Sequence, residues 1–287
     1  MEFSNYTNDD YDEIIEFLIQ LSNEGENHIN WNWARFEWMI EHPETDKSKL
    51  ETIGLWWEED RIVGAAIFDM YYGEAFCGAL NAYADILPDI LDYAYHNLKD
   101  ESGLGIAICD EDLKTIELAM RLGYEKAEQT ENIMAFNLDK IYHSVLPNEI
   151  VINEYDPAND PYEFAWLLWQ GFDHGNDKSE FESQDKKERQ LRKYLDKRLS
   201  LAAEDSLGNI VGYVCLWYSP KTDYAYVEPV CTIPEFRNNG ISKALLAEAF
   251  RRVNKFGAKK AFVISDMDFY KKLGFENYAL FSFYWKE

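Results

Sequence analysis

The sequence has few positive charges for its length and no long apolar run. Its 287 residues carry 28 Lys and Arg against 53 Asp and Glu, a formal net charge of −25. Such a charge disfavours nucleic acid and anionic membranes as partners, because both attract clustered cations. No stretch reaches the ~18 apolar residues typical of a membrane-spanning helix. Residues 1–13 are acidic and lack the apolar core of a secretory signal.

Cysteine is also scarce. None of the four cysteines is part of a C-x-x-C pair, and each lies in an apolar, strand-like stretch. This pattern is typical of structural thiols that stay reduced, so we expect a cytoplasmic protein with no metal site. The four positions are Cys77, Cys109, Cys215 and Cys231.

Two common phosphate-binding patterns are missing as well. The sequence has neither the G-x-x-x-x-G-K-[ST] loop nor the G-x-G-x-x-G turn. What it does have is a strand followed by a helix between Tyr224 and Phe256. Residues 224–232 are rich in β-branched and aromatic residues and predict a strand, in which Pro229 indicates a bulge or an edge. The apolar face of the helix repeats at helical spacing in Leu246, Ala249, Phe250 and Val253.

The junction between them, Arg237 to Ser242, reads R-N-N-G-I-S. The first turn of a helix leaves about four backbone N–H groups unpaired, with a partial positive charge. Gly240 permits a left-handed backbone and a close approach by a ligand, and Arg237 adds a cation at the same end. The junction therefore suits a phosphate or diphosphate. The alternative from these residues alone is an ordinary helix start beside a surface arginine.

The stretch E-P-V-C-T-I-P-E-F-R-N-N-G-I-S-K-A-L-L resembles the acyl-coenzyme A loop of the GNAT superfamily of N-acetyltransferases, whose pattern is R-x-x-G-x-[GA] after a bulged strand. Downstream, F-Y-K-K-L-G-F at 269–275 is similar to the closing motif of that family. The resemblance covers residues 151–287. Two departures stand out: Ser242 replaces the usual Gly or Ala, and the short segment before Tyr270 lacks the Asn with which many members contact coenzyme A.

The resemblance implies acetyl-coenzyme A as co-substrate and an amine as acceptor. Such a reaction needs a base for the amine, a donor for the oxyanion and an acid for the thiolate. The family motif places Tyr270 as the acid, and Glu228 is the candidate base or a substrate anchor. Cys231 as an acyl-accepting nucleophile is the weaker alternative to a buried structural thiol, because no His lies near it in sequence. The expected coenzyme-binding residues are Val230, Cys231, Thr232, Arg237, Asn238, Asn239, Gly240, Ile241 and Ser242.

The order of predicted elements repeats along the chain. I-V-G at 62–64 matches I-V-G at 210–212, and L-G-Y at 122–124 matches L-G-F at 273–275. The glycines of these two motifs are 59 residues apart in the first half and 62 in the second, and a closing strand is predicted after each pair. We therefore predict a mixed α/β (α+β) fold of two tandem GNAT-like domains, 1–140 and 150–287, each a mixed central sheet flanked by helices.

The first predicted domain has no equivalent of the coenzyme loop. The residues before its central helix are Ala82-Tyr83-Ala84-Asp85-Ile86, with no glycine, no arginine and an acidic group near the helix start. We expect this half to hold no diphosphate and to serve a structural or substrate-shaping role.

The predicted helices and strands of the rest of the chain follow from periodicity and turn residues. The helices are predicted at 8–22, 31–41, 87–99, 111–122, 161–172 and 178–197, and the strands at 51–58, 61–71, 104–109, 133–138, from 151, 199–204, 210–217 and 260–264. Trp166 and Trp169 share one helical face in the region that caps the acceptor site in GNAT proteins, and core packing is the default reading of that pair.

The charge is unevenly distributed. Residues 237–287 hold ten Lys and Arg against five Asp and Glu, whereas residues 1–236 have a net charge of −30. A basic region suits an anionic coenzyme, and an acidic body suits a cationic amine. We therefore expect a cytoplasmic N-acetyltransferase, a monomer or a homodimer, acting on a primary amine of a small molecule or peptide. Two alternatives stay open: a non-catalytic acyl-coenzyme A binding or sensing protein, and an interaction module using the acidic first half.

Overall fold

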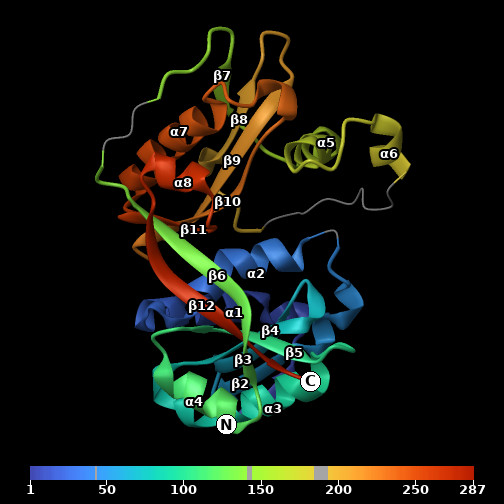
Figure 1. The fold of residues 1–287 in the computed structure, drawn as a ribbon, viewed down its shortest axis with the longest axis vertical. Helices are drawn as coiled ribbons and strands as arrows, with labels where there is room; N and C mark the ends of the chain where they lie inside the picture. Colours follow the sequence, from blue (N-terminus) through green and yellow to red (C-terminus); the bar gives the residue numbers. More distant parts are fainter. Residues whose placement is uncertain (43, 141–143, 184–192) are drawn as a thin grey trace. The chain divides into compact units, whose positions relative to one another are not determined.

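The computed structural model describes residues 1–42, 44–140, 144–183 and 193–287 (Figure 1). The chain forms two compact units. The first comprises Met1–Met134, Ile264–Asp266 and Asn277–Glu287, and the second comprises Ala135–Val263 and Met267–Glu276. Neither unit is one continuous segment, because the C-terminal strand belongs to the first unit. The domain boundaries 1–140 and 150–287 remain a prediction from the sequence.

The first unit is a mixed sheet with helices. Its strand order is β1-β2-β3-β4-β5-β12-β6, with β4 and β5 parallel and the neighbouring pairs β1–β2, β2–β3, β3–β4 and β5–β12 antiparallel. The strands are β1 (Glu2–Asn5), β2 (Gly54–Glu58), β3 (Arg61–Asp69), β4 (Tyr71–Ala79), β5 (Leu104–Cys109), β6 (Glu125–Asn137) and β12 (Glu276–Lys286). The α-helices are α1 (Tyr11–Glu24), α2 (Trp33–Ile40), α3 (Leu87–Asn97) and α4 (Leu113–Arg121), and the 3-10 turns are η1 (Asn8–Asp10), η2 (Glu26–Trp31), η3 (Lys47–Thr52) and η4 (Asn81–Ile86).

Helices α1 and α3 cover opposite faces of this sheet. A Cβ placed on Gly64 of β3 would lie 2.7 Å from Ile90 of α3, and one on Gly78 of β4 would lie 3.3 Å from Leu21 of α1. Gly78 is paired with Ala65, so these two residues point to the same face of the sheet. Gly64 precedes Ala65 and points to the opposite face, because adjacent strand residues alternate.

The second unit repeats this plan. Its strand order is β6-β11-β10-β9-β8-β7, in which β10 and β11 are parallel. Its strands are β7 (Val151–Glu154), β8 (Ser200–Glu204), β9 (Ile210–Tyr218), β10 (Tyr224–Thr232) and β11 (Lys260–Ile264). Its helices are α5 (Pro161–Gly171), α6 (Lys178–Ser183), α7 (Ile241–Phe256) and α8 (Asp268–Leu273), with 3-10 turns η5 (Lys197–Leu199) and η6 (Pro234–Phe236).

Helices α5 and α7 again lie on opposite faces of the sheet. Tyr213 of β9 packs its ring against Phe164 of α5, with the ring centroids 4.9 Å apart. Its neighbour Gly212 faces the other way, where a Cβ would lie 3.1 Å from Ile241 at the start of α7. The predicted apolar face of α7 is confirmed, because all four of its residues are buried.

The sequence repeat corresponds to a structural repeat. Gly64 and Gly212 occupy the same place in their units, where a sheet strand meets the long central helix. Gly123 and Gly274 follow α4 and α8 with left-handed φ values of 89° and 98°. Only a residue without Cβ takes this conformation at little cost, which explains why both halves keep a glycine there.

Several predicted elements differ from the structure. Two strands of the structure, β1 and β4, were not predicted. Strand β6 begins at Glu125, well before the predicted start at residue 133. Of the helix predicted at 178–197, residues 178–183 form α6, residues 193–196 are not helical, and 184–192 lie outside the described residues. Within the described ranges, every helix is too short or too polar to cross a membrane.

Candidate active site

The site begins at a bulge in β10. In the pairing with β9, Val227 lies opposite Leu216 and Val230 lies opposite Val214. Glu228 and Pro229 therefore share the place of one residue, so Pro229 marks a bulge in a central strand and not an edge. The Glu228–Pro229 peptide bond is cis. The Nε1–H of buried Trp217 donates to the carbonyl oxygen of Glu228 at 2.7 Å and holds the bulge in place.

Strands β10 and β11 separate at this bulge. Their parallel pairing runs from Tyr224 with Lys260 to Tyr226 with Phe262 and stops there. Beyond it, β10 continues through Val230 and Cys231 with β9 as its partner. The edge of these residues that faces β11 has no ladder partner in the described part of the chain. A bulged strand with an open edge leaves backbone N–H groups available to a ligand.

The predicted catalytic residues lie near one another. Tyr270 of α8 is buried, and burial followed by the negative charge of Glu228 raises the pKa of its phenol. Glu228 also acts on Cys231. Burial raises the pKa of the Cys231 thiol to about 12, and the charge of Glu228 adds to that effect. The charge of one carboxylate therefore raises the pKa of both side chains. The protonated, buried thiol is a poor nucleophile.

The Tyr270 ring is fixed by aromatic packing. Its centroid lies 5.3 Å from Phe275 and 5.0 Å from Phe269, each in an edge-on arrangement. No other described residue makes a hydrogen bond to its hydroxyl, so the proton of this phenol is available to a bound molecule. With a raised pKa, the phenol stays protonated at neutral pH.

The start of α7 has the geometry of an anion site. Gly240 has a left-handed φ of 80°, Asn238 has a φ of 63°, and no side chain caps the first helical turn. Among the described residues, a Cβ on Gly240 would have only the Val145 carbonyl within 4 Å, at 3.9 Å, which leaves room for a ligand at the turn. The hydroxyls of Thr232 and Ser242 are hydrogen-bonded to each other at 2.6 Å beside this turn. The residues therefore fit a diphosphate.

The cation of Arg237, expected at the start of α7, is already paired within the protein. Its Nη1 donates to both carboxylate oxygens of Asp173, at 2.8 and 3.0 Å. Its Nη2 and Nε donate to the carbonyls of Gly171 and Thr232, at 2.9 and 3.0 Å. The guanidinium thus fastens the end of α5 to the loop before α7. The sequence did not predict Gly171 and Asp173 as partners of Arg237, because neither residue belongs to a recognisable motif.

The aromatic residues of α5 form a small core with α6. The rings of Trp166 and Trp169 lie 5.3 and 5.7 Å from that of Phe181, and His174 lies 5.0 Å from Trp169. The default reading of the tryptophan pair as packing residues matches this arrangement. Across the described residues, no group of three or more His, Cys, Asp and Glu is placed to hold a metal ion.

Comparisons with known proteins now bear on this geometry. Residues 161–275 match the family model described as the acetyltransferase (GNAT) family. This segment includes α5, the bulged β10, the start of α7 and Tyr270.

The predicted resemblance to the GNAT superfamily is thereby confirmed for residues 161–275.

The fold of the whole chain is that of known GNAT proteins. A GNAT protein from Sphaerobacter thermophilus has a TM-score of 0.56 and 15% identity, over 100% of this chain and 95% of that one. A tandem GNAT protein from the clavulanic acid biosynthesis pathway has a TM-score of 0.60 and 14% identity, over 99% and 97%. These likenesses confirm the predicted tandem GNAT fold. A search of curated proteins finds no match.

A third solved structure shares the fold with a lower score. It is the glucosamine N-acetyltransferase region of a fungal multi-domain β-N-acetylglucosaminidase. The TM-score is 0.51 and the identity 14%, over 99% of this chain and 38% of that one.

Proposed function

We propose that the protein transfers an acetyl group from acetyl-coenzyme A directly to a primary amine of a small molecule or peptide. The observation that carries this proposal is the convergence in the second unit of a bulged β10, an uncapped glycine-led α7 and a protonated Tyr270. All three lie within the segment that matches the GNAT family.

The chain holds the coenzyme through backbone groups more than through Arg237. The N–H groups at the start of α7 bind the diphosphate, since Arg237 is already paired with Asp173. The open edge of β10 binds the extended part of the molecule. The proposed coenzyme-binding residues are Val230, Cys231, Thr232, Arg237, Asn238, Asn239, Gly240, Ile241 and Ser242, with Arg237 as a positioning residue.

The reaction steps follow from the residues of the site. When bound, the coenzyme supplies an acetyl group activated as a thioester. Glu228, directly or through water, accepts the proton of the incoming ammonium. A backbone N–H of Val230 or Cys231 donates to the carbonyl oxygen. Tyr270 gives its phenolic proton to the departing sulfur. The raised pKa of Tyr270 keeps that proton in place until the sulfur leaves.

The charge of the chain favours a cationic acceptor. A net charge of −30 over residues 1–236 raises the local concentration of cations and speeds their encounter with the protein. Polyamines, amino sugars and basic peptide termini belong to this class. The likeness to a glucosamine N-acetyltransferase region makes amino sugars a natural part of a test panel.

Turnover with a panel of amines tests the proposal. The chain is mixed with acetyl-coenzyme A and spermidine, glucosamine or a lysine-terminated peptide, and free thiol and acetylated amine are both measured. We expect amine-dependent thiol release and an acetylated product. Coenzyme binding without any acetylated product would instead identify a non-catalytic acyl-coenzyme A binding protein, and absence of binding would exclude both functions.

A further inference from the structure

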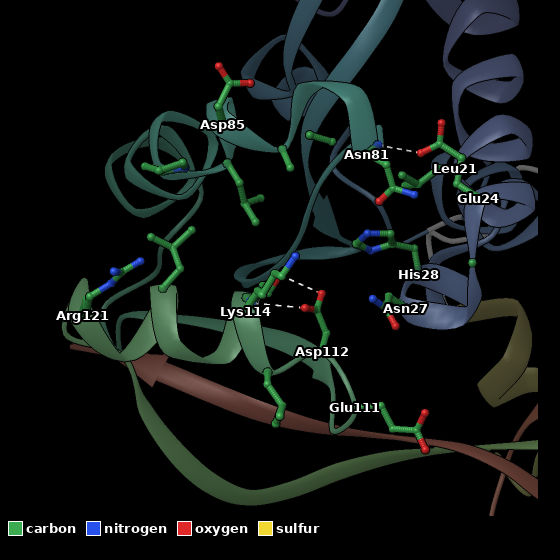
Figure 2. A pocket seen from close by; sticks show the side chains of 18 residues that line it. Leu21, Glu24, Asn27, His28, Asn81, Asp85, Glu111, Asp112, Lys114 and Arg121 are labelled. Atoms are coloured by element: carbon green, nitrogen blue, oxygen red, sulfur yellow. Dashed lines mark hydrogen bonds between the residues drawn. The ribbon is translucent and has the colours of Figure 1, made fainter.

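The first unit has its own opening between parallel strands. The pairing of β4 with β5 is limited to Glu74 with Gly105 and Ala75 with Ile106. Beyond it the strands separate, as β10 and β11 do in the second unit. A cavity of about 850 Å³ lies in this part of the unit, between α1, η2, η4 and α4 (Figure 2). This volume is in the range of small-molecule sites.

The cavity joins an apolar floor to an acidic rim. The apolar lining residues are Leu21, Ala79, Ala84, Leu87, Pro88, Leu113 and Leu118. The charged residues are four carboxylates, Glu24, Asp85, Glu111 and Asp112, and two cations, Lys114 and Arg121. The side chains of Asn27, His28 and Asn81 supply neutral polar groups (Figure 2). An apolar floor with an excess of carboxylates suits an organic cation.

The local backbone disfavours a diphosphate here. The start of α3 has Ile86 as its N-cap, Pro88 in the first turn and the carboxylate of Asp89 beside it. Proline removes one backbone N–H, and the acidic group neutralises the partial charge of the turn. No described residue between Gly73 and Gly103 has a left-handed φ, whereas Asn238 and Gly240 do in the second unit.

His28 is a polar group without a protein partner in this cavity. Neither ring nitrogen forms a hydrogen bond with another described residue, and the ring packs edge-on against Phe76 at 5.8 Å. Burial lowers the pKa of His28 to about 4, and the charge of Asp112 opposes that shift. The imidazole is therefore neutral at pH 7 and adds no positive charge to the acidic rim. Figure 2 shows His28 of η2 and Asp112, the N-cap of α4, both lining the cavity.

We infer that this cavity of the first unit is a binding site for a small organic cation that joins an apolar body to an ammonium group. The ammonium donates to Glu24 or Asp112, and the apolar body covers Leu21 and Leu118. This site lies outside the GNAT site of the second unit and goes beyond the acetyl transfer proposed there.

Calorimetry on the full chain tests the inference with two probes of opposite charge. Tryptamine and indole-3-propionate have the same ring system, and only tryptamine is a cation. We expect tryptamine to bind and indole-3-propionate to bind at least ~10-fold more weakly, because like charges repel the anion. Equal or tighter binding of the anion would overturn the inference.

Two variants place the binding in this cavity. Glu24→Gln with Asp112→Asn removes two rim charges but keeps oxygen acceptors for the N–H groups of Asn81 and Thr115. We expect a loss of tryptamine affinity of about 10-fold or more. Ala84→Trp, at an exposed position of the cavity wall, should remove the binding by filling the space.

The matched control removes the same number of charges, one from α1 and one from α4, the helix that Asp112 caps. Glu13 of α1 and Glu117 of α4 are exposed and do not line the cavity. Glu13→Gln with Glu117→Gln should leave the affinity for tryptamine within about 2-fold of the unaltered chain, because only distant charges change. Equal weakening in this control, or unchanged binding in both cavity variants, would contradict a site in the first unit.

Discussion

Tyr270 carries the clearest prediction for a single residue. Its phenol is buried, protonated at neutral pH and close to the charge of Glu228. Tyr270→Phe keeps the ring packing against Phe275 and removes only the hydroxyl. We expect kcat to fall by roughly 10²-fold, the usual size of one acid–base contribution, while the Kd for acetyl-coenzyme A stays the same. Steady-state kinetics and calorimetry measure the two quantities.

The outcome separates two roles for the tyrosine. An equal loss in coenzyme affinity would indicate that Tyr270 positions the coenzyme. Full activity of the variant would remove it from the proposed reaction.

Some roles of single residues could be predicted from the sequence, and others could not. The family motif placed Tyr270, and the proline of the strand indicated the bulge at Glu228. The structure adds that the charge of Glu228 acts on the phenol of Tyr270. The role of Arg237 was not predictable, because its partners Asp173 and Gly171 are 64 and 66 positions away and follow no local pattern.

At the scale of elements, an ion network on the outer face of α7 ties this helix to an edge strand. Glu248 accepts hydrogen bonds from Arg251 at 2.8 and 2.6 Å and from Arg252 at 2.8 Å. The hydrogen bonds from Arg251, and then those from Arg252, lower the pKa of Glu248 from 4.5 to about 2. Arg252 also donates to Glu154 of β7 at 2.6 Å, which ties the helix to the edge strand.

This network gives a stability prediction with a defined pH window. A carboxylate whose folded pKa is lowered stabilises the protein above its unfolded pKa, and the contribution is lost as the pH falls through the folded pKa. Glu248→Gln should therefore lower the free energy of unfolding by about 1–2 kcal/mol at pH 7. The difference from the unaltered chain should shrink below pH 4.5 and vanish below about pH 2. Urea unfolding across this range measures it, and a difference independent of pH would contradict the account.

Local patterns predicted the elements better than their pairing. The bounds of β5, β10 and β11 matched, because dense apolar and β-branched residues mark each strand. β4 was missed because its glycines and polar residues weaken the strand pattern. A closing strand after α8 was expected, but its membership of the first unit was not. Pairing of β12 with β5 joins residues more than 170 positions apart, which no periodicity encodes.

For the whole molecule, the acidic charge predicts a salt-dependent encounter with the acceptor. The Debye length falls from about 30 Å at 0.01 M salt to about 3 Å at 1 M, so steering of a cation weakens as salt rises. We expect kcat/KM for the preferred amine to fall with added salt, measured at saturating coenzyme. A neutral or anionic preferred acceptor, or a kcat/KM that is flat in salt, would leave the charge as a solubility feature.

The central claim is that the two units differ in their ability to bind the coenzyme. The second unit has a left-handed Gly240 and an uncapped α7, whereas the first has Pro88 and Asp89 at the matching place. Acetyl-coenzyme A should therefore bind only in the second unit. Gly208 offers a matched control for Gly240, because its φ of 82° is nearly the same and it lies in the β8–β9 turn.

Calorimetric titration of the chain with acetyl-coenzyme A tests this claim most directly. The account predicts one site per chain, its loss in Gly240→Val and its retention in Gly208→Val, because both variants strain a left-handed backbone and only the first blocks the diphosphate. Two sites per chain, or unchanged affinity in Gly240→Val, would contradict it.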